Sequence, residues 1–192
     1  MTAGFRNCFF AVSIAVIGIT YSKAEDTTFE LPGLDGKPLN ALDVGDKKAV
    51  VLFFISPYCP TSNNFGPAMN EIAAEFRGQF TFHFIHSDKG VREQDILQHA
   101  SMMSIEDPIL HDADQALAKH LGATITPETI VLDEEGQVLY RGRINDLYLG
   151  PTNRQQEATT HDLKTALTQI LSEQKIAVTE TEPVGCKISG LK

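Results

Sequence analysis

One cysteine stands where cysteine chemistry is physically favoured. Cys59 follows the apolar run Ala49–Ile55, which is typical of a strand covered on both faces, and it comes directly before a segment with helical spacing. The free backbone N–H groups and the dipole at a helix start stabilise an anion, and the thiolate is the nucleophilic form of cysteine. Cys59 is therefore predicted to be a nucleophile. An inert buried thiol, or one half of a structural disulfide, is the alternative.

Cys186 is the predicted partner of that nucleophile. Cys8 lies in the N-terminal leader described below, so the mature chain keeps two cysteines, which can form one bridge but no disulfide framework. From Lys175 to Cys186 an extended chain spans roughly 36 Å, whereas a domain of this size has a radius of gyration of about 15 Å. Cys186 can therefore reach Cys59 and resolve its oxidised form. A static staple or an intermolecular bridge is the alternative.

Four histidines raise the question of a metal site. They are His83, His86, His111 and His161. On a strand, His83 and His86 are three residues apart and point to opposite faces, so they cannot bind one ion together. His161 is expected to cap or flank the last helix. We predict no metal and no cofactor, and no phosphate-binding loop, dinucleotide fingerprint or serine-hydrolase elbow is present in the sequence.

The elements that must position Cys59 follow from the apolar periodicity. Residues 29–39 alternate apolar pieces with Gly and Pro, which predicts an N-terminal hairpin, and Ala49–Ile55 is the predicted central strand. After the turn at residues 56–60, apolar side chains at helical spacing predict a helix that extends to Phe76. Ser62 or Asn63 is the expected cap of this helix.

The rest of the chain alternates between strands and helices. The predicted order is a strand at residues 80–84, a short helix at Val91–Met102, a helix at Asp112–Leu121, a strand hairpin at residues 129–141 and a last helix at Leu163–Leu171, capped by Thr160 or Asp162. This order predicts a mixed sheet with a βαβ unit and a closing antiparallel pair, which makes an α/β fold, a three-layer α/β/α sandwich. Residues 25–174 are the predicted domain, and residues 175–192 are a tail without periodicity.

The first 24 residues resemble a secretory signal peptide. Arg6 supplies a positive start, the apolar run Cys8–Tyr21 is too short to span a bilayer of about 30 Å, and the run ends at Ser22-Lys23-Ala24. Cleavage is expected before Glu25, and an uncleaved anchor is the alternative. The 16 Lys and Arg against 25 Asp and Glu give a net charge of −9, and loss of Arg6 and Lys23 makes it 14 − 25 = −11. This charge disfavours nucleic acid and anionic lipid as partners.

Two sequence segments carry a resemblance to a known family. The strand Ala49–Ile55 with Ser56-Pro57-Tyr58-Cys59-Pro60-Thr61-Ser62, and Thr126-Pro127-Glu128-Thr129 before an apolar strand, resemble the thioredoxin-like superfamily. The likeness is to exported redoxins of the peroxiredoxin and thiol-disulfide reductase type. It implies a thioredoxin-like sandwich in which Thr126-Pro127 is a cis-proline turn that faces Cys59 and holds the substrate backbone.

The chain departs from that family in three places. Thioredoxins carry a second cysteine where this chain has Ser62, and a buried acid where it has Phe53. Peroxiredoxins carry Pro seven residues before the reactive cysteine and Thr or Ser three residues before it. Ser56 fits the second position, whereas Leu52 replaces the proline of the first. Glu128 is a candidate for proton transfer, although a solvated glutamate at a strand start is the more ordinary interpretation.

These observations predict an exported thiol-dependent oxidoreductase. Cys59 would attack a protein disulfide or a peroxide, Thr126 and Pro127 would present the substrate, and Cys186 would resolve the product, with a thiol as electron donor. After cleavage of the leader we expect no stable membrane insertion. The alternative is a non-catalytic domain of the same fold that serves binding, assembly or copper handling.

Overall fold

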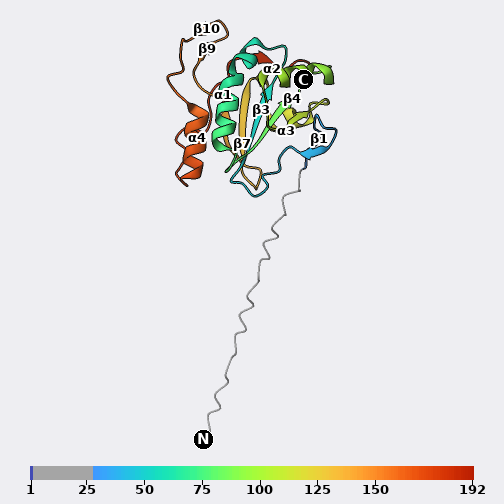
Figure 1. Cartoon of the computed structure of the whole chain (residues 1–192). Coiled ribbons are helices and arrows are strands. Elements are labelled where there is room, and N and C mark those ends of the chain that lie inside the picture. Colours follow the sequence, from blue (N-terminus) through green and yellow to red (C-terminus); the bar gives the residue numbers. More distant parts are fainter. Residues whose placement is uncertain (2–27) are drawn as a thin grey trace.

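The computed structural model describes Met1 and residues 28–192 (Figure 1). The predicted leader, apart from Met1, and its cleavage point therefore lie outside the described residues. Five strands form the main sheet in the order β5-β4-β3-β7-β8. The elements in chain order are β1 (Glu30–Pro32), β2 (Pro38–Asn40), β3 (Val50–Ile55), α1 (Pro60–Phe76), β4 (Thr81–His86), α2 (Glu93–Met103), β5 (Ile109–His111), α3 (Ala116–Leu121), β6 (Ile125–Thr126), β7 (Glu128–Leu132), β8 (Val138–Gly142), β9 (Tyr148–Gly150), β10 (Asn153–Arg154), α4 (Asp162–Leu171) and β11 (Cys186–Lys187).

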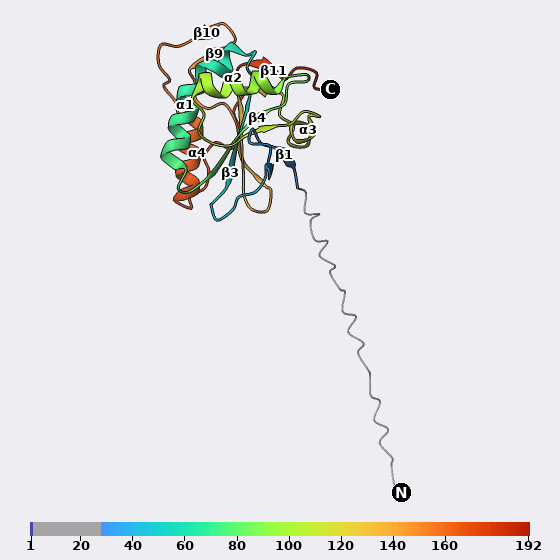
Figure 2. The ribbon, with the colours of Figure 1, turned by 45° about the vertical axis from the view of Figure 1, so that its right-hand side comes forward.

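Strand β3 is the centre of the sheet. All of its residues are buried, and it runs parallel to β4 and antiparallel to β7. Its side chains alternate between two apolar clusters, one packed with α1, α2 and α4 and the other with α3 and the β1–β2 hairpin. Figure 2 shows α1 and α4 on one side of the sheet and α3 on the other. The predicted three-layer sandwich, with its mixed sheet and N-terminal hairpin, is confirmed.

Helix α1 begins directly after the cysteine, as predicted, and its N-cap is the cysteine itself. The helix starts at Pro60, and Cys59 is the N-cap, with an extended backbone at φ −101° and ψ 108°. Pro60 explains this start, because proline has no N–H to lose and its φ is already helical. The predicted caps Ser62 and Asn63 are therefore wrong. Ser62 lies in the first turn and is fully buried, where it donates its backbone N–H to the Cys59 sulfur.

The residues from Lys175 onward lie against the domain although their sequence has no periodicity. The backbone of Glu180 forms an isolated parallel β-bridge with that of Arg141 in β8, and β11 pairs antiparallel with β6. Ile188 is 4% exposed and packs in the cluster beside α3. No helix in the described part of the chain is long and apolar enough to cross a membrane.

Two buried histidines connect β4 with α2. The rings of His86 and His99 lie 5.1 Å apart, and His99 Nδ1 is 3.4 Å from His86 Nε2. The other ring nitrogen of His99 is 2.8 Å from Asn63 Oδ1 on α1. Burial lowers the pKa of His86 to about 3 and that of His99 to about 4. Both rings are therefore neutral at neutral pH, whereas the unfolded chain gains their protons below about pH 6.5.

We predict that this histidine pair makes the fold acid-sensitive. Because the folded pKa values lie below the unfolded value, the unfolded state binds more protons as the pH falls from about 6.5 towards 3, and the free energy of unfolding decreases by several kcal/mol. His86→Leu should flatten this slope in urea titrations. His161→Leu, at an exposed position, should keep it. Identical pH profiles of wild type and His86→Leu would show that the pair is not responsible.

Candidate active site

Cys59 lies at the junction of three backbone segments. Its Sγ accepts a hydrogen bond from the backbone N–H of Ser62 at 3.4 Å and, as a thiol, donates to the carbonyl oxygen of Thr126 at 2.9 Å. Its side chain has no exposed surface. The sulfur is therefore hydrogen-bonded to backbone groups of both α1 and the turn before β7.

The turn around Ser56 fixes the path of the chain from β3 into α1. The backbone N–H of Ser56 donates to Ser62 Oγ at 3.2 Å, and its own hydroxyl accepts from the N–H of Tyr58 at 3.2 Å. Ser62 thus contributes two atoms, one to the turn and one to the sulfur. Serine replaces the second cysteine of thioredoxins here, and its hydroxyl serves to close the turn.

The Thr126-Pro127 peptide bond is cis, and it lies between β6 and β7. Thr126 is 2% exposed and supplies the carbonyl that contacts Cys59. The structure therefore brings Cys59 and the Thr126-Pro127 turn together. Whether this turn presents a substrate stays a prediction.

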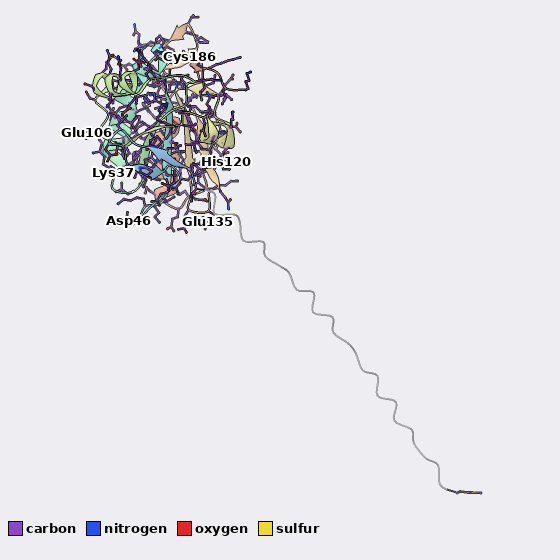
Figure 3. The ribbon with its side chains drawn as sticks, turned by 90° about the vertical axis from the view of Figure 1, so that its right-hand side faces the viewer. Lys37, Asp46, Glu106, His120, Glu135 and Cys186 are labelled. Carbon is purple, nitrogen blue, oxygen red and sulfur yellow. The ribbon has the colours of Figure 1, made fainter. Side chains whose placement is uncertain are left out.

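Cys186 is brought to the same place by β11. In the pairing of β11 with β6, Cys186 lies opposite Thr126, and Lys187 lies opposite Ile125. Both cysteines are free thiols. Burial, then a hydrogen bond with Cys59 and the charge of Cys59, raise the pKa of Cys186 to about 11. In Figure 3, Cys186 lies at the end of the molecule opposite the loops that carry Asp46 and Glu135.

A profile of the AhpC/TSA family matches residues 22–141. The chain belongs to the AhpC/TSA family. No curated protein matches the sequence.

Solved structures support the same fold for this AhpC/TSA family member. An uncharacterised conserved protein from Geobacillus kaustophilus is 23% identical, with a TM-score of 0.77, and the match covers 86% of this chain and 89% of that one. A hypothetical protein from Sinorhizobium meliloti 1021 is 26% identical, with a TM-score of 0.76 and coverage of 84% and 90%. A secreted disulfide oxidoreductase from Mycobacterium tuberculosis is 20% identical, with a TM-score of 0.54 and coverage of 76% and 96%. The fold is thus thioredoxin-like.

Glu128 is buried rather than solvated, which corrects the more ordinary interpretation of its place at a strand start. It is 5% exposed. Its carboxylate accepts from the backbone N–H groups of Thr124 and Ile125 at 3.0 and 3.4 Å, and Arg141 Nε lies 3.8 Å from it. Burial raises the pKa of Glu128. These contacts show a carboxylate that holds the bend before β6, the strand on which β11 rests.

The histidines are distributed as their spacing predicts. His83 donates from Nδ1 to the carbonyl oxygen of Ala41 at 3.0 Å, whereas His86 of the same strand contacts His99. His161 is the N-cap residue of α4, so the prediction that it caps or flanks the last helix is confirmed. Among residues 28–192, no group of three or more His, Cys, Asp or Glu side chains is arranged to hold a metal ion.

We predict that Glu128→Ala destabilises the protein by about 1–3 kcal/mol, because it leaves the N–H groups of Thr124 and Ile125 without their acceptor. Glu128→Gln keeps one acceptor oxygen and should lose less. Urea unfolding measures both, with Glu135→Ala in the exposed β7–β8 turn as the control. Equal stability of Glu128→Ala and Glu135→Ala would contradict a bracing role.

Proposed function

We propose that this protein is an exported thiol-dependent oxidoreductase in which Cys59 is the nucleophile and Cys186 is the resolving thiol. The observation that carries the proposal is the pairing of β11 with β6, which sets Cys186 against Thr126, the residue whose carbonyl contacts Cys59. Cys59 and Cys186 come from distant parts of the sequence and both lie against Thr126, so they can exchange a disulfide without a large movement.

The first step is an attack by the Cys59 thiolate on the oxidant. With a hydroperoxide, a bond forms between the sulfur and the distal oxygen, the O–O bond breaks, and an alcohol or water leaves after taking a proton, so that Cys59 becomes a sulfenic acid. With a disulfide, a bond forms to one sulfur and the other leaves as a thiolate. The backbone N–H of Ser62 stabilises the attacking thiolate.

The second step is an attack by Cys186 on the sulfur of Cys59. The S–S bond forms while the S–O bond of the sulfenic acid, or the S–S bond of the mixed disulfide, breaks and releases water or a thiol. An external thiol then reduces the Cys59–Cys186 disulfide by two exchange steps and returns both thiols. Each cycle passes two electrons from that donor to the oxidant.

Electrostatics puts the two steps in order. The pKa of Cys186 is raised by burial and also by its hydrogen bond with Cys59 and the charge of Cys59. While Cys59 is a thiolate, Cys186 therefore stays protonated. Oxidation of Cys59 removes its charge. The part of the pKa increase of Cys186 that comes from this charge therefore disappears at the step in which the Cys186 thiolate attacks.

Export is supported by the leader-like residues 1–24 and by the secreted disulfide oxidoreductase of Mycobacterium tuberculosis among the similar folds. We expect that N-terminal sequencing of the exported protein begins at Glu25. An exported protein that still begins at Met1 would indicate an uncleaved anchor.

We predict that Cys186→Ser traps the first step. After one equivalent of oxidant, the wild type should show a Cys59–Cys186 disulfide by peptide mapping. Cys186→Ser should show a sulfenic acid on Cys59 that dimedone captures, or a stable mixed disulfide. Cys59→Ser, the matched control, should leave Cys186 as a thiol and consume no oxidant, because burial, the largest cause of the raised pKa of Cys186, remains when Cys59 is replaced.

Two outcomes would contradict the proposal. Oxidation of Cys59→Ser at the wild-type rate would remove Cys59 as the nucleophile. If the Cys59–Cys186 disulfide were only structural, it would resist dithiothreitol in the folded wild type. Cys186→Ser would then lose about 2–5 kcal/mol of stability.

A further inference from the structure

The segment that carries Cys186 is fixed across the site at both of its ends. We call residues 179–189 the strap. Upstream, the backbone of Arg141 donates to the carbonyl oxygen of Thr179 at 2.9 Å and accepts from the N–H of Thr181 at 3.0 Å. Downstream, the N–H of Ser189 donates to Asp88 Oδ1 at 2.7 Å, and the side chain of Gln115 donates to the carbonyl oxygen of Ser189 at 2.8 Å. The strap is thus held by β8 and by the loops after β4 and β5.

At two points the strap lies so close to a neighbouring segment that the residue at the contact has no room for a side chain. A Cβ on Gly185 would lie 2.0 Å from the carbonyl oxygen of Thr126, and a Cβ on Gly142 would lie 2.0 Å from that of Thr181. Separations below about 3 Å require the backbone to shift. Glycine at both positions therefore permits the close approach that puts Cys186 beside Cys59.

The strap occupies the edge of β6. Cys186 and Lys187 already pair with Thr126 and Ile125, and the N–H of Ile188 donates to the carbonyl oxygen of Thr124 at 2.9 Å. An incoming extended polypeptide that pairs with this edge needs the same backbone groups. Under the strap, Cys59 has no exposed surface.

We infer that the strap decides which oxidants reach Cys59: small oxidants react with the strap in place, and a polypeptide disulfide reacts only when the strap leaves β6. The inference rests on the proposed role of Cys59 as the nucleophile. A hydroperoxide leaves one oxygen atom on Cys59 and releases an alcohol or water. A polypeptide disulfide leaves a whole chain on that sulfur, where Cys186 and Gly185 now lie, and releases its other sulfur as a thiol.

The experiment uses the full chain with Cys8→Ser and Cys186→Ser, so that Cys59 is its single cysteine. Gly185→Ala in this background displaces the strap through the clash with Thr126. Gly78→Ala is the matched control, because a Cβ there meets nothing within 4 Å. Ile188→Ala is a second way to loosen the strap, since it removes a buried side chain without a backbone clash. Circular dichroism and thermal unfolding confirm that each variant is folded.

Two probes with the same leaving group measure the selectivity. The small probe is free cysteine, and the large probe is an unstructured ten-residue peptide with one cysteine. Each is used as its mixed disulfide with thionitrobenzoate. Hydrogen peroxide serves as the reference oxidant. With the strap in place, we expect cysteine to react at least about tenfold faster than the peptide, which corresponds to about 1.4 kcal/mol. Gly185→Ala and Ile188→Ala should accelerate the peptide more than cysteine and reduce this ratio, and Gly78→Ala should preserve it.

The possible failures are distinguishable. Equal rates for both probes with the strap in place, or equal acceleration of both probes in Gly185→Ala and Ile188→Ala, would overturn the inference while leaving Cys59 as the nucleophile. If neither probe nor hydrogen peroxide modifies Cys59 in any of these folded variants, the proposed function itself is wrong, and the inference falls with it.

Discussion

The contact between the Cys59 sulfur and the carbonyl oxygen of Thr126 is the point on which the site depends. It joins the start of α1 to the turn before β7, and β7 pairs with β3, the strand that leads to Cys59. Because β3 is buried on both faces, neither the strand nor the turn can shift without disturbing both apolar clusters. The sulfur is therefore held between well-packed elements, which is what the geometry of the proposed nucleophile requires.

The chemistry at this contact depends on backbone groups more than on side chains. An N–H from Ser62 and a carbonyl from Thr126 contact the sulfur, and the charged side chain nearest in sequence to the turn, Glu128, holds the bend instead. Backbone donors and acceptors cannot turn away from the sulfur as long side chains can. A thiol held in this way loses little conformational entropy when it reacts.

The sequence predicts the elements whose signals are local. The continuous apolar run of β3, the helical spacing of α1 and the β7–β8 hairpin all have patterns within a few residues, and the structure contains each of them. The cap of α1 was predictable in principle, because Pro60 marks the first helical position and Cys59 the one before it. The general preference for Ser and Asn at the N-cap favoured Ser62 and Asn63, which was wrong. Here the sulfur of Cys59 accepts the hydrogen bond that an N-cap oxygen usually accepts.

The strand β11 and the burial of Glu128 depend on contacts between distant segments. A strand of two residues has no periodicity, and it exists here because β6, some sixty residues earlier, offers a free edge. Gly185 is the residue next to β11 whose type reflects this pairing. Its role cannot be inferred from the sequence, because it depends on the close approach of Thr126. Glu128 similarly acquires its partners from the bend at Thr124 and from β8.

The position of the second thiol has a consequence for how the site works. A resolving cysteine in the first turn of α1, at the place of Ser62, would belong to the same rigid helix as Cys59 and would leave the edge of β6 open. In this chain the second thiol arrives on a strand that pairs with β6, so the groups that bring Cys186 to Cys59 also cover Cys59. In the proposed mechanism, access to Cys59 and resolution by Cys186 therefore depend on the same backbone hydrogen bonds: a movement of β11 that opens the site to a large partner also withdraws Cys186 from Cys59.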